Sequence, residues 1–376
     1  MVKWIEIDLK ILADNVKAVR KALSKNALFM AVVKADGYGH GAVWVSKIAM
    51  KNGADVLGVL TVEEGIRLRQ ENIKAPIAIL SPSLPEDAGR IFKNRLIPTV
   101  DSMKFLKTLN DRAHKNASCP YCIDLDMGLG RWGVSPELFL NFAEKASKFK
   151  NLKAVSISTH IAYTAQKNMT EAEEKLMAFR NLALKAKNFF PGIKMHAANS
   201  SILVDFPRWQ MDMARIGNLI YGIYPSKLYL RNSRTAATGV GGYADDEKVK
   251  GPPIKGLGRP WKFYSKLISI KTVNRGQSLG YSSEYVAPAK MRIGTIPVGY
   301  SDGLTMEPAE KTIKLTAGSS YWGMIRGKPA PFIAKSGIAH TLLDLTAVPE
   351  AKIGDHVLLP IRRTAANAKI PRIYKY

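Results

Sequence analysis

AVVKADGYGHG, at residues 31–41, is the stretch that decides how this chain is interpreted. Its apolar start is typical of the end of a buried strand, and the three glycines after Lys34 allow a tight turn beside a bulky group. Burial at a strand end disfavours the charged form of a lysine, so Lys34 is a candidate neutral amine. The spacing alone equally allows a lysine whose head group reaches solvent past the strand end.

The first two thirds of the chain alternate between short apolar runs and amphipathic stretches. We expect the runs to be parallel strands and the stretches, rich in Lys, Glu, Ala and Leu, to be helices. Eight such units predict a (β/α)8 barrel over residues 9–228. A doubly wound open sheet is the alternative, but no Gly-rich dinucleotide motif follows the first strand. The expected strands lie near 28–34, 55–61, 77–82, 97–101, 121–126, 154–161, 193–198 and 215–222, and helices include 63–70, 102–114, 136–149 and 170–189.

The remaining segments differ from the barrel part in composition and in the pattern of apolar residues. Residues 229–262 are polar and rich in Gly and Pro, which indicates a surface insertion or linker. Short β-type runs separated by turn residues predict a mostly-β C-terminal domain over residues 263–376. We expect residues 1–8 to form a strand that joins this second domain.

Composition restricts the function classes. The 376 residues carry a net charge of +25, but the Lys and Arg residues are dispersed and no nucleic-acid motif is present, so nucleic acid is an unlikely partner. No run approaches the roughly 18 apolar residues of a membrane span, and the start does not resemble a secretory signal. We therefore expect a cytoplasmic protein with no membrane partner.

The two cysteines, Cys119 and Cys122, form a CxxC pair. Redox pairs of this kind place the first thiol at a helix amino terminus, where its pKa falls. Here the pair leads into an alternating, strand-like stretch, and two cysteines without histidine neighbours are poor metal ligands. We expect buried strand cysteines and no metal site.

Polar residues follow five of the predicted barrel strands, at the ends where barrel enzymes carry their chemistry. A single residue of this kind more often has a structural role, with its hydrogen bonds made inside the protein, but five together indicate a functional site. Small residues near Ser200 and Gly217 would also leave backbone N–H groups free for a phosphate. The five are Lys34, Arg131, His160, His196 and Arg215.

At this point the chain resembles the alanine racemases, a family of pyridoxal-phosphate enzymes with a barrel and a β domain. The similar segments occur in the family's order over nearly the whole length, and VVKADGYGHG is the most specific of them. They are VVKADGYGHG (32–41), MGLGRWGV (127–134), TH (159–160), HAANSS (196–201), ARIGNLIYGIYPS (214–226), LGYSSEY (279–285), GTIPVGYSDG (294–303) and IPRIY (370–374).

The resemblance implies a two-base racemase. Lys34 would carry pyridoxal 5'-phosphate and act as base on one face of the substrate. Tyr281, delivered by the other subunit of a homodimer, would act on the opposite face. A tyrosine is a weak base unless positive charge favours the phenolate, and the family sets His160 and then Arg215 behind it.

Further roles follow from the same resemblance. Arg215 would face the pyridine nitrogen, where a permanent positive charge weakens the electron sink and restrains transamination and decarboxylation. Arg131 would contact the cofactor oxygen and the substrate carboxylate, and Ile338 would line the substrate. The implied phosphate and cofactor contacts are Tyr38, Asn199, Ser200, Gly217 and Asn218.

Departures from the family's pattern fall on the substrate side. Asp124 stands where the family often has a lysine, sometimes carbamylated, and we hypothesise that its carboxylate orients Arg131. Ile338-Ala339 replaces a Met-Asp pair. The usual acidic residue is missing from 161–165, and the C-terminal gate tyrosine has no counterpart.

These features predict an amino-acid racemase that interconverts L- and D-alanine, the latter a peptidoglycan precursor. A racemase for serine or a broader set of amino acids is the alternative, although the charge of +25 favours small neutral substrates. A barrel-type decarboxylase or aldolase is less favoured because Tyr281 and Arg215 are present. A noncatalytic pyridoxal-phosphate carrier is less favoured because such proteins resemble the barrel alone.

Overall fold

The computed structural model describes residues 1–113, 118–164, 167–225, 254–283, 285–304 and 322–376. Within them the chain forms two compact units, of which one contains 10–225 and 254–259 and the other 1–9 and 260–376. Most of the polar insertion expected at 229–262 lies outside the described residues. Among the helices of the described part, none combines the length and apolar character needed to cross a membrane.

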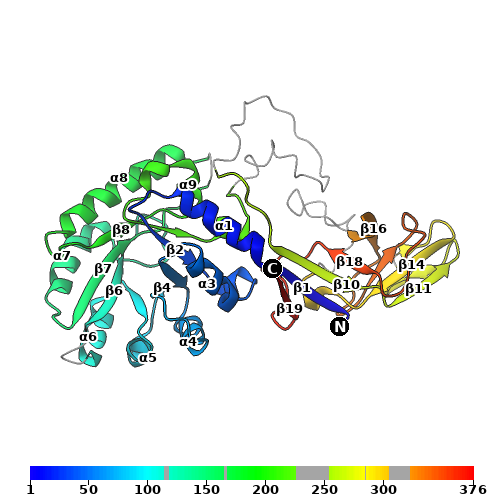
Figure 1. Cartoon of the computed structure of the whole chain (residues 1–376), viewed down its shortest axis with the longest axis horizontal. Helices are drawn as coiled ribbons and strands as arrows, with labels where there is room; N and C mark the ends of the chain where they lie inside the picture. Colours follow the sequence, from blue (N-terminus) through cyan, green and yellow to red (C-terminus); the bar gives the residue numbers. More distant parts are fainter. Residues whose placement is uncertain (114–117, 165–166, 226–253, 284, 305–321) are drawn as a thin grey trace. The chain divides into compact units, whose positions relative to one another are not determined.

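The larger unit is a nearly closed barrel of eight parallel strands (Figure 1). The hydrogen-bonded order is β8-β7-β6-β5-β4-β3-β2-β9. Strand β9 is joined to the segment that follows β8 by the Arg215 N–H, which donates to the carbonyl oxygen of Ala198 at 2.8 Å. This confirms the predicted (β/α)8 fold. The strands are β2 (Leu28–Val32), β3 (Val56–Val59), β4 (Ile77–Pro82), β5 (Ile97–Val100), β6 (Cys119–Asp124), β7 (Leu152–Ser158), β8 (Lys194–His196) and β9 (Met213–Ile216).

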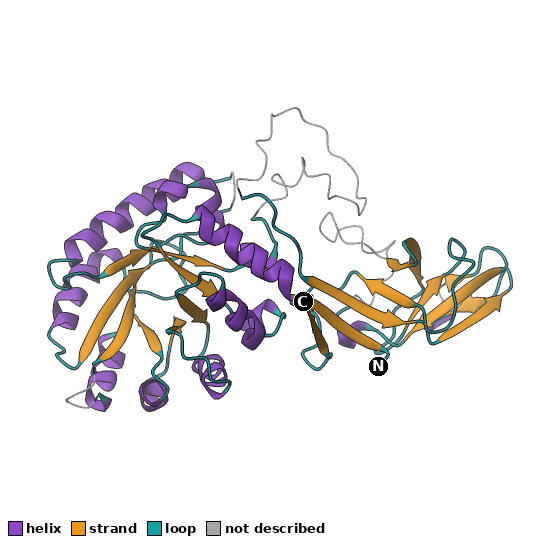
Figure 2. Ribbon diagram, in the orientation of Figure 1, coloured by secondary structure: helices purple, strands orange, loops and turns teal. Residues whose placement is uncertain are grey.

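Helices cover the outside of these strands (Figure 2). Each predicted amphipathic stretch is a helix, and the apolar face of each is buried. The α-helices of this layer are α1 (Leu9–Ala22), α3 (Ala42–Lys51), α4 (Val62–Gln70), α5 (Ala88–Lys93), α6 (Met103–Arg112), α7 (Pro136–Ser147), α8 (Met169–Ala186) and α9 (Ser200–Asp205), with 3-10 turns at η1 (Pro85–Asp87), η2 (Pro207–Trp209) and η3 (Asn218–Tyr221).

The second unit is almost entirely β structure (Figure 2). Its nine-stranded sheet has the order β11-β14-β17-β16-β15-β18-β10-β1-β19. The first strand of the chain pairs with β10 on one side and with the last strand, β19, on the other. The strands are β1 (Lys3–Asp8), β10 (Trp261–Lys266), β11 (Ser269–Val273), β14 (Met291–Ile296), β15 (Trp322–Ile325), β16 (Lys328–Ile333), β17 (Thr341–Asp344), β18 (His356–Leu359) and β19 (Arg372–Lys375), with a separate pair β12 (Ser278–Leu279) and β13 (Tyr285–Val286).

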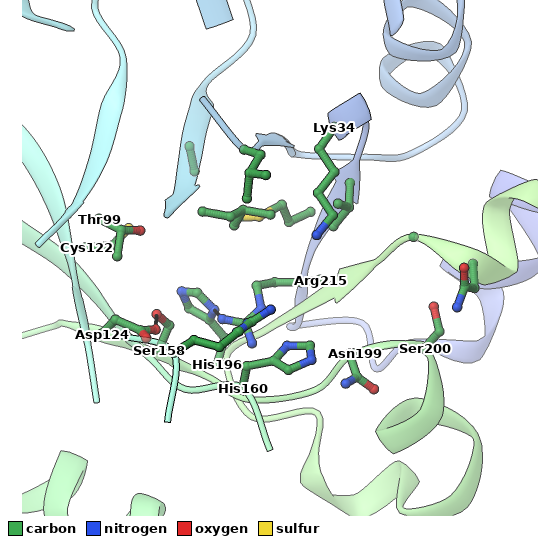
Figure 3. Close-up of a pocket in the computed structure, with 18 of the residues that line it drawn as sticks. Lys34, Thr99, Cys122, Asp124, Ser158, His160, His196, Asn199, Ser200 and Arg215 are labelled. Atoms are coloured by element: carbon green, nitrogen blue, oxygen red, sulfur yellow. Dashed lines mark hydrogen bonds between the residues drawn. The ribbon is translucent and has the colours of Figure 1, made fainter. Parts of the chain in front are cut away.

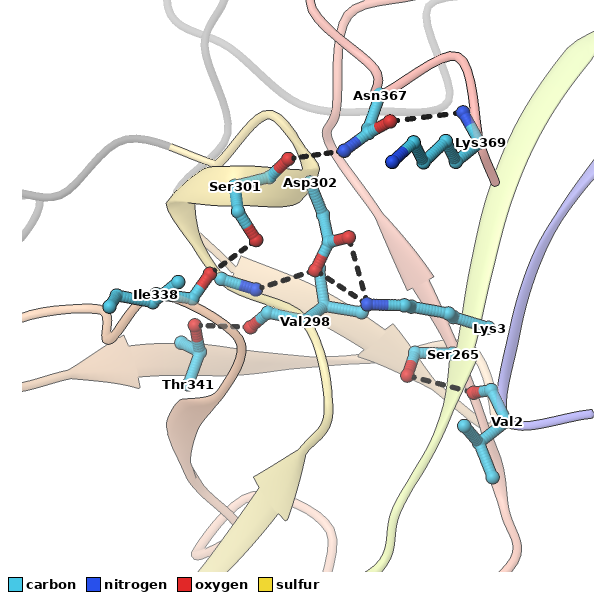
Figure 4. A network of polar contacts seen from close by, with 11 residues as sticks. Val2, Lys3, Ser265, Val298, Ser301, Asp302, Ile338, Thr341, Asn367 and Lys369 are labelled. Atoms are coloured by element: carbon cyan, nitrogen blue, oxygen red, sulfur yellow. Dashed lines mark hydrogen bonds and ion pairs between the residues drawn. The ribbon is translucent and has the colours of Figure 1, made fainter. Parts of the chain in front are cut away.

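A polar network in this unit fixes the loop that contains Ile338 (Figure 4). The amine of Lys3 forms an ion pair with both oxygens of the buried Asp302 carboxylate, at 2.8 and 2.9 Å. Asp302 ends the turn η6 (Tyr300–Asp302), and this turn donates two hydrogen bonds to the carbonyl oxygen of Ile338. A Cβ at Gly299 would lie 2.1 Å from a carbonyl oxygen of the same loop. Only glycine therefore allows this close approach.

Candidate active site

The chain leaves strand β2 through a left-handed turn, assigned as α2 (Lys34–Tyr38). Five consecutive residues have positive φ angles: 52° at Ala35, 51° at Asp36, 63° at Gly37, 54° at Tyr38 and 87° at Gly39. This conformation is costly for residues with a side chain, so it needs support. The Ala35 N–H donates to a carboxylate oxygen of Glu64 at 2.6 Å. Glu64 lies in the first turn of α4, so this helix supports the backbone of the segment that begins with Lys34.

Lys34 is half-buried and lines a cavity at the carboxyl ends of the barrel strands. Burial, followed by the charge of Arg131, lowers the pKa of its amine below the ordinary value. The Arg215 charge acts in the same direction, while Glu64 opposes both. These effects shift the amine in the direction of the neutral form expected from the sequence.

The cavity has a volume of about 330 Å³. Most of the residues singled out in the sequence line it, and Figure 3 shows them converging from different strands. Tyr281 and Ile338 belong to the second unit and are not among its lining residues. The residues singled out in the sequence that line the cavity are Lys34, Tyr38, Asp124, Arg131, His160, His196, Asn199, Ser200, Arg215, Gly217 and Asn218.

Arg215 lies at the centre of the cavity wall and is 8% exposed. One terminal nitrogen of its guanidinium lies 3.2 Å from Nδ1 of His196, and the other donates to the carbonyl oxygen of Thr159. No hydrogen bond joins Arg215 to His160 in the described chain. The group that contacts this arginine is therefore the histidine of β8, although sequence reasoning had placed His160 beside it.

His160 nevertheless lies in a strongly cationic environment. Burial, and then the charges of Arg215, Arg131 and Lys34, lower the pKa of its imidazole to about 3. The ring is consequently neutral near pH 7 and can serve as a hydrogen-bonding group without adding positive charge.

The segments that follow β8 and β9 contribute Ser200, Gly217 and Asn218 to the lining of the cavity. A Cβ at Gly217 would lie 2.6 Å from the hydroxyl oxygen of Tyr38, so a side chain at this position would collide with the tyrosine. The Ser200 hydroxyl faces the cavity and Asn218 lies beside it at the start of η3. Asn199 has a structural role too, because its side-chain oxygen caps α9 by accepting two backbone N–H groups at 2.9 and 3.0 Å.

Asp124 is a buried carboxylate of the cavity wall, 7% exposed. It accepts a hydrogen bond from the hydroxyl of Ser158 at 2.5 Å. Burial raises its pKa to about 6, against the opposing effects of Ser158 and Arg215. The guanidinium of Arg131 lies over the ring of Trp132 at 4.3 Å, and among the described residues it forms no ion pair with Asp124.

Tyr281 begins the 3-10 turn η5 (Tyr281–Ser283) and is 58% exposed. Its ring lies 5.7 Å from the ring of His340, measured between centroids. The two side chains and Lys335 line a smaller pocket of about 200 Å³ in the second unit. Ile338, the predicted substrate contact, is 60% exposed.

Sequence reasoning noted His196 at a strand end but gave it no role, and it missed Ser156, Trp132 and Tyr163. Ser156 and Ser158 alternate on β7 with apolar residues, and that period marks them as pointing to one side of the strand.

The prediction for Cys119 and Cys122 is confirmed, because both are buried in β6 and neither forms a disulfide. Burial raises the pKa of each thiol to about 11. No cluster that could hold a metal ion occurs within the described ranges.

Two family models match the chain. Residues 7–225 match the one described as alanine racemase, N-terminal domain, and residues 261–372 match alanine racemase, C-terminal domain. An alanine racemase of Halothermothrix orenii is 31% identical over 359 residues, which are 95% of this chain and 86% of that protein. An alanine racemase of a Nostoc species is 32% identical over 364 residues, with the same coverage.

Solved structures agree on the fold. The alanine racemase of Clostridium difficile 630 superposes with a TM-score of 0.85 at 24% identity, over 100% of this chain and 96% of that one. An alanine racemase from E. faecalis gives a TM-score of 0.84 at 24% identity, over 99% and 98% of the two chains.

Proposed function

This chain belongs to the alanine racemase family, and from that premise we propose that it interconverts L- and D-alanine with pyridoxal 5'-phosphate as cofactor. It is an isomerase of the amino-acid racemase type. The observation that carries the proposal is the convergence of Lys34 and Arg215 on one cavity whose lining also includes Ser200, Gly217 and Asn218.

The residues of the cavity fit this cofactor. The amine of Lys34, whose pKa burial lowers, would attach it, and the rim formed by Tyr38, Ser200, Gly217 and Asn218 would hold its phosphate. Arg215 would face the ring nitrogen. Once bound, pyridoxal phosphate withdraws electrons from the substrate's α-carbon and so acidifies its C–H bond.

The protein's own groups then move one proton. We assign the amine of Lys34 to one face of the α-carbon and the hydroxyl of Tyr281, from the partner subunit of a homodimer, to the other. The guanidinium of Arg215 carries a permanent charge. Its presence beside the ring nitrogen would disfavour nitrogen protonation and so restrain decarboxylation and transamination. Arg131 would hold the substrate carboxylate.

The test is loss of optical activity from L-alanine, followed by circular dichroism with added cofactor. We expect racemisation in both directions, and a Tyr281→Phe variant that loses both while retaining cofactor absorbance. Release of carbon dioxide or an aldehyde would instead support a lyase. Cofactor absorbance without any racemisation of alanine, serine or other common amino acids would contradict the proposed function.

A further inference from the structure

A continuous chain of hydrogen bonds runs from the cavity into the barrel interior. Arg215 contacts Nδ1 of His196 at 3.2 Å, and Nε2 of the same ring lies 3.0 Å from the hydroxyl oxygen of Ser156. That hydroxyl donates to the sulfur of Cys122 at 2.8 Å. Strands β9, β8, β7 and β6 each contribute one residue. All four residues are buried, with exposed fractions between 1% and 8%.

The direction of each hydrogen bond follows from what its groups can do. A guanidinium has only donors, so Nδ1 of His196 must be the acceptor and carry no proton. The proton of the neutral ring is then on Nε2, which donates to the oxygen of Ser156. The serine can accept this bond because its own hydrogen is directed to Cys122. The arrangement therefore selects the Nε2–H tautomer of His196.

The other protonation states would disrupt this geometry. A proton on Nδ1 would point at a guanidinium N–H, and a doubly protonated ring would put two cations in contact. Burial and the charge of Arg215 lower the pKa of His196 well below its ordinary value, which agrees with a neutral ring. Neutrality alone, however, does not choose between the two tautomers. Arg215, which only donates, excludes a proton on Nδ1, and Ser156 supplies the acceptor that the proton on Nε2 requires.

We propose that Ser156, oriented by Cys122, is a positioning residue that locks His196 in the Nε2–H tautomer and thereby holds the guanidinium of Arg215 in the cavity. The catalytic part of this inference rests on the proposed function, in which Arg215 faces the cofactor ring. The tautomer part does not, since it concerns four side chains of this chain alone.

Nitrogen-15 NMR of the full chain, labelled only at histidine, tests the tautomer. The chain has six histidines, and loss of one signal set in His196→Gln identifies the signals of His196. We expect a protonated Nε2 and an unprotonated Nδ1. In Ser156→Ala the Nε2–H of His196 loses its acceptor while Arg215 still excludes a proton on Nδ1, so we expect the nitrogen signals of His196 to move. Cys122→Ala should move them less, and Ser156→Thr should retain the native pattern. Ser158→Ala, on the same strand but bonded to Asp124, is the matched control and should leave these signals unmoved.

Activity provides the second arm. Leaving the Nε2–H donor of His196 unsatisfied in Ser156→Ala should lower kcat/KM for alanine roughly fivefold to a hundredfold, and Ser156→Thr should restore it. A native Nδ1–H form, or a Ser156→Ala variant with unchanged signals and unchanged kcat/KM, would overturn the proposal. If the wild type racemises nothing, the proposed function fails while the NMR arm still decides the tautomer.

Discussion

At the level of single residues, the cavity concentrates positive charge. Lys34, Arg131 and Arg215 line it, and Asp124 is the one carboxylate among its lining residues. The charges of Arg215 and Arg131 both act on the carboxylate of Asp124, which accepts a hydrogen bond from the hydroxyl of Ser158. We therefore retain the proposal that Asp124 orients Arg131, as a charge in the barrel wall and not as an ion-pair partner.

Asp124→Ala should raise the KM for alanine severalfold, because Arg131 would lose the negative charge that orients it toward the substrate carboxylate. Steady-state kinetics with purified variants check this. Asp124→Glu keeps the charge and is the control. An Asp124→Ala enzyme with unchanged KM would refute the role.

His160 predicts a dependence of stability on pH. Its folded pKa of about 3 lies below its ordinary value of 6.5, so between these values the unfolded chain binds the proton more tightly. The stability that depends on neutral His160 is therefore present above pH 6.5 and is lost as the pH falls toward 3, by up to about 4 kcal/mol.

Urea denaturation of the wild type and His160→Gln at several pH values between 7 and 4 measures this difference. We expect the wild type to lose more of its free energy of unfolding on acidification than the variant does. If the free energy of unfolding falls by the same amount in the two proteins, the protonation of His160 does not contribute to the loss of stability.

At the level of elements, the turn that presents Tyr281 is held by a neighbouring loop. Gly280 has a φ of 76°, and a Cβ there would lie 2.4 Å from the Cβ of Ala334. Ala334 itself has a φ of 56°. The same loop continues to His340, whose ring packs beside Tyr281. Displacing either backbone would move the phenol.

Gly280→Ala should lower kcat by up to about a hundredfold, because a small displacement of a catalytic group has effects of that size. The double variant Gly280→Ala/Ala334→Gly removes the clash and should recover most of the activity. Racemisation kinetics and the cofactor absorbance are the measurements. Equal defects in the single and double variants would contradict a positioning effect of this contact.

The order of strands and helices could be predicted because short apolar runs alternate with amphipathic stretches along the barrel part of the chain. Residue Lys34 at the end of β2 was predictable for the same reason. The hydrogen-bond partner of Arg215 could not be predicted. Contact between residues 196 and 215 depends on which side chains of neighbouring strands point inward at the same level of the barrel. The left-handed turn after Lys34 was signalled by its glycines. That Ala35 and Asp36 share this conformation was not, because the Glu64 carboxylate that accepts from the Ala35 N–H lies 29 residues along the chain.

At the level of the whole molecule, the proposed mechanism requires a dimer in which the two bases of one site come from different chains. Mixing tests this. Inactive Lys34→Ala and Tyr281→Phe chains, allowed to exchange subunits, should form heterodimers with one intact site, and about a quarter of the wild-type activity should return. If both bases came from one chain, mixing would restore nothing.

The central claim is that Lys34 is the amine that attaches pyridoxal phosphate. Borohydride reduction of the cofactor-loaded protein, followed by peptide mapping, measures this directly. We predict a single reduced pyridoxyl group on the peptide that contains residues 31–41, at Lys34. A label on another lysine, or no label in a protein that racemises alanine, would contradict the account.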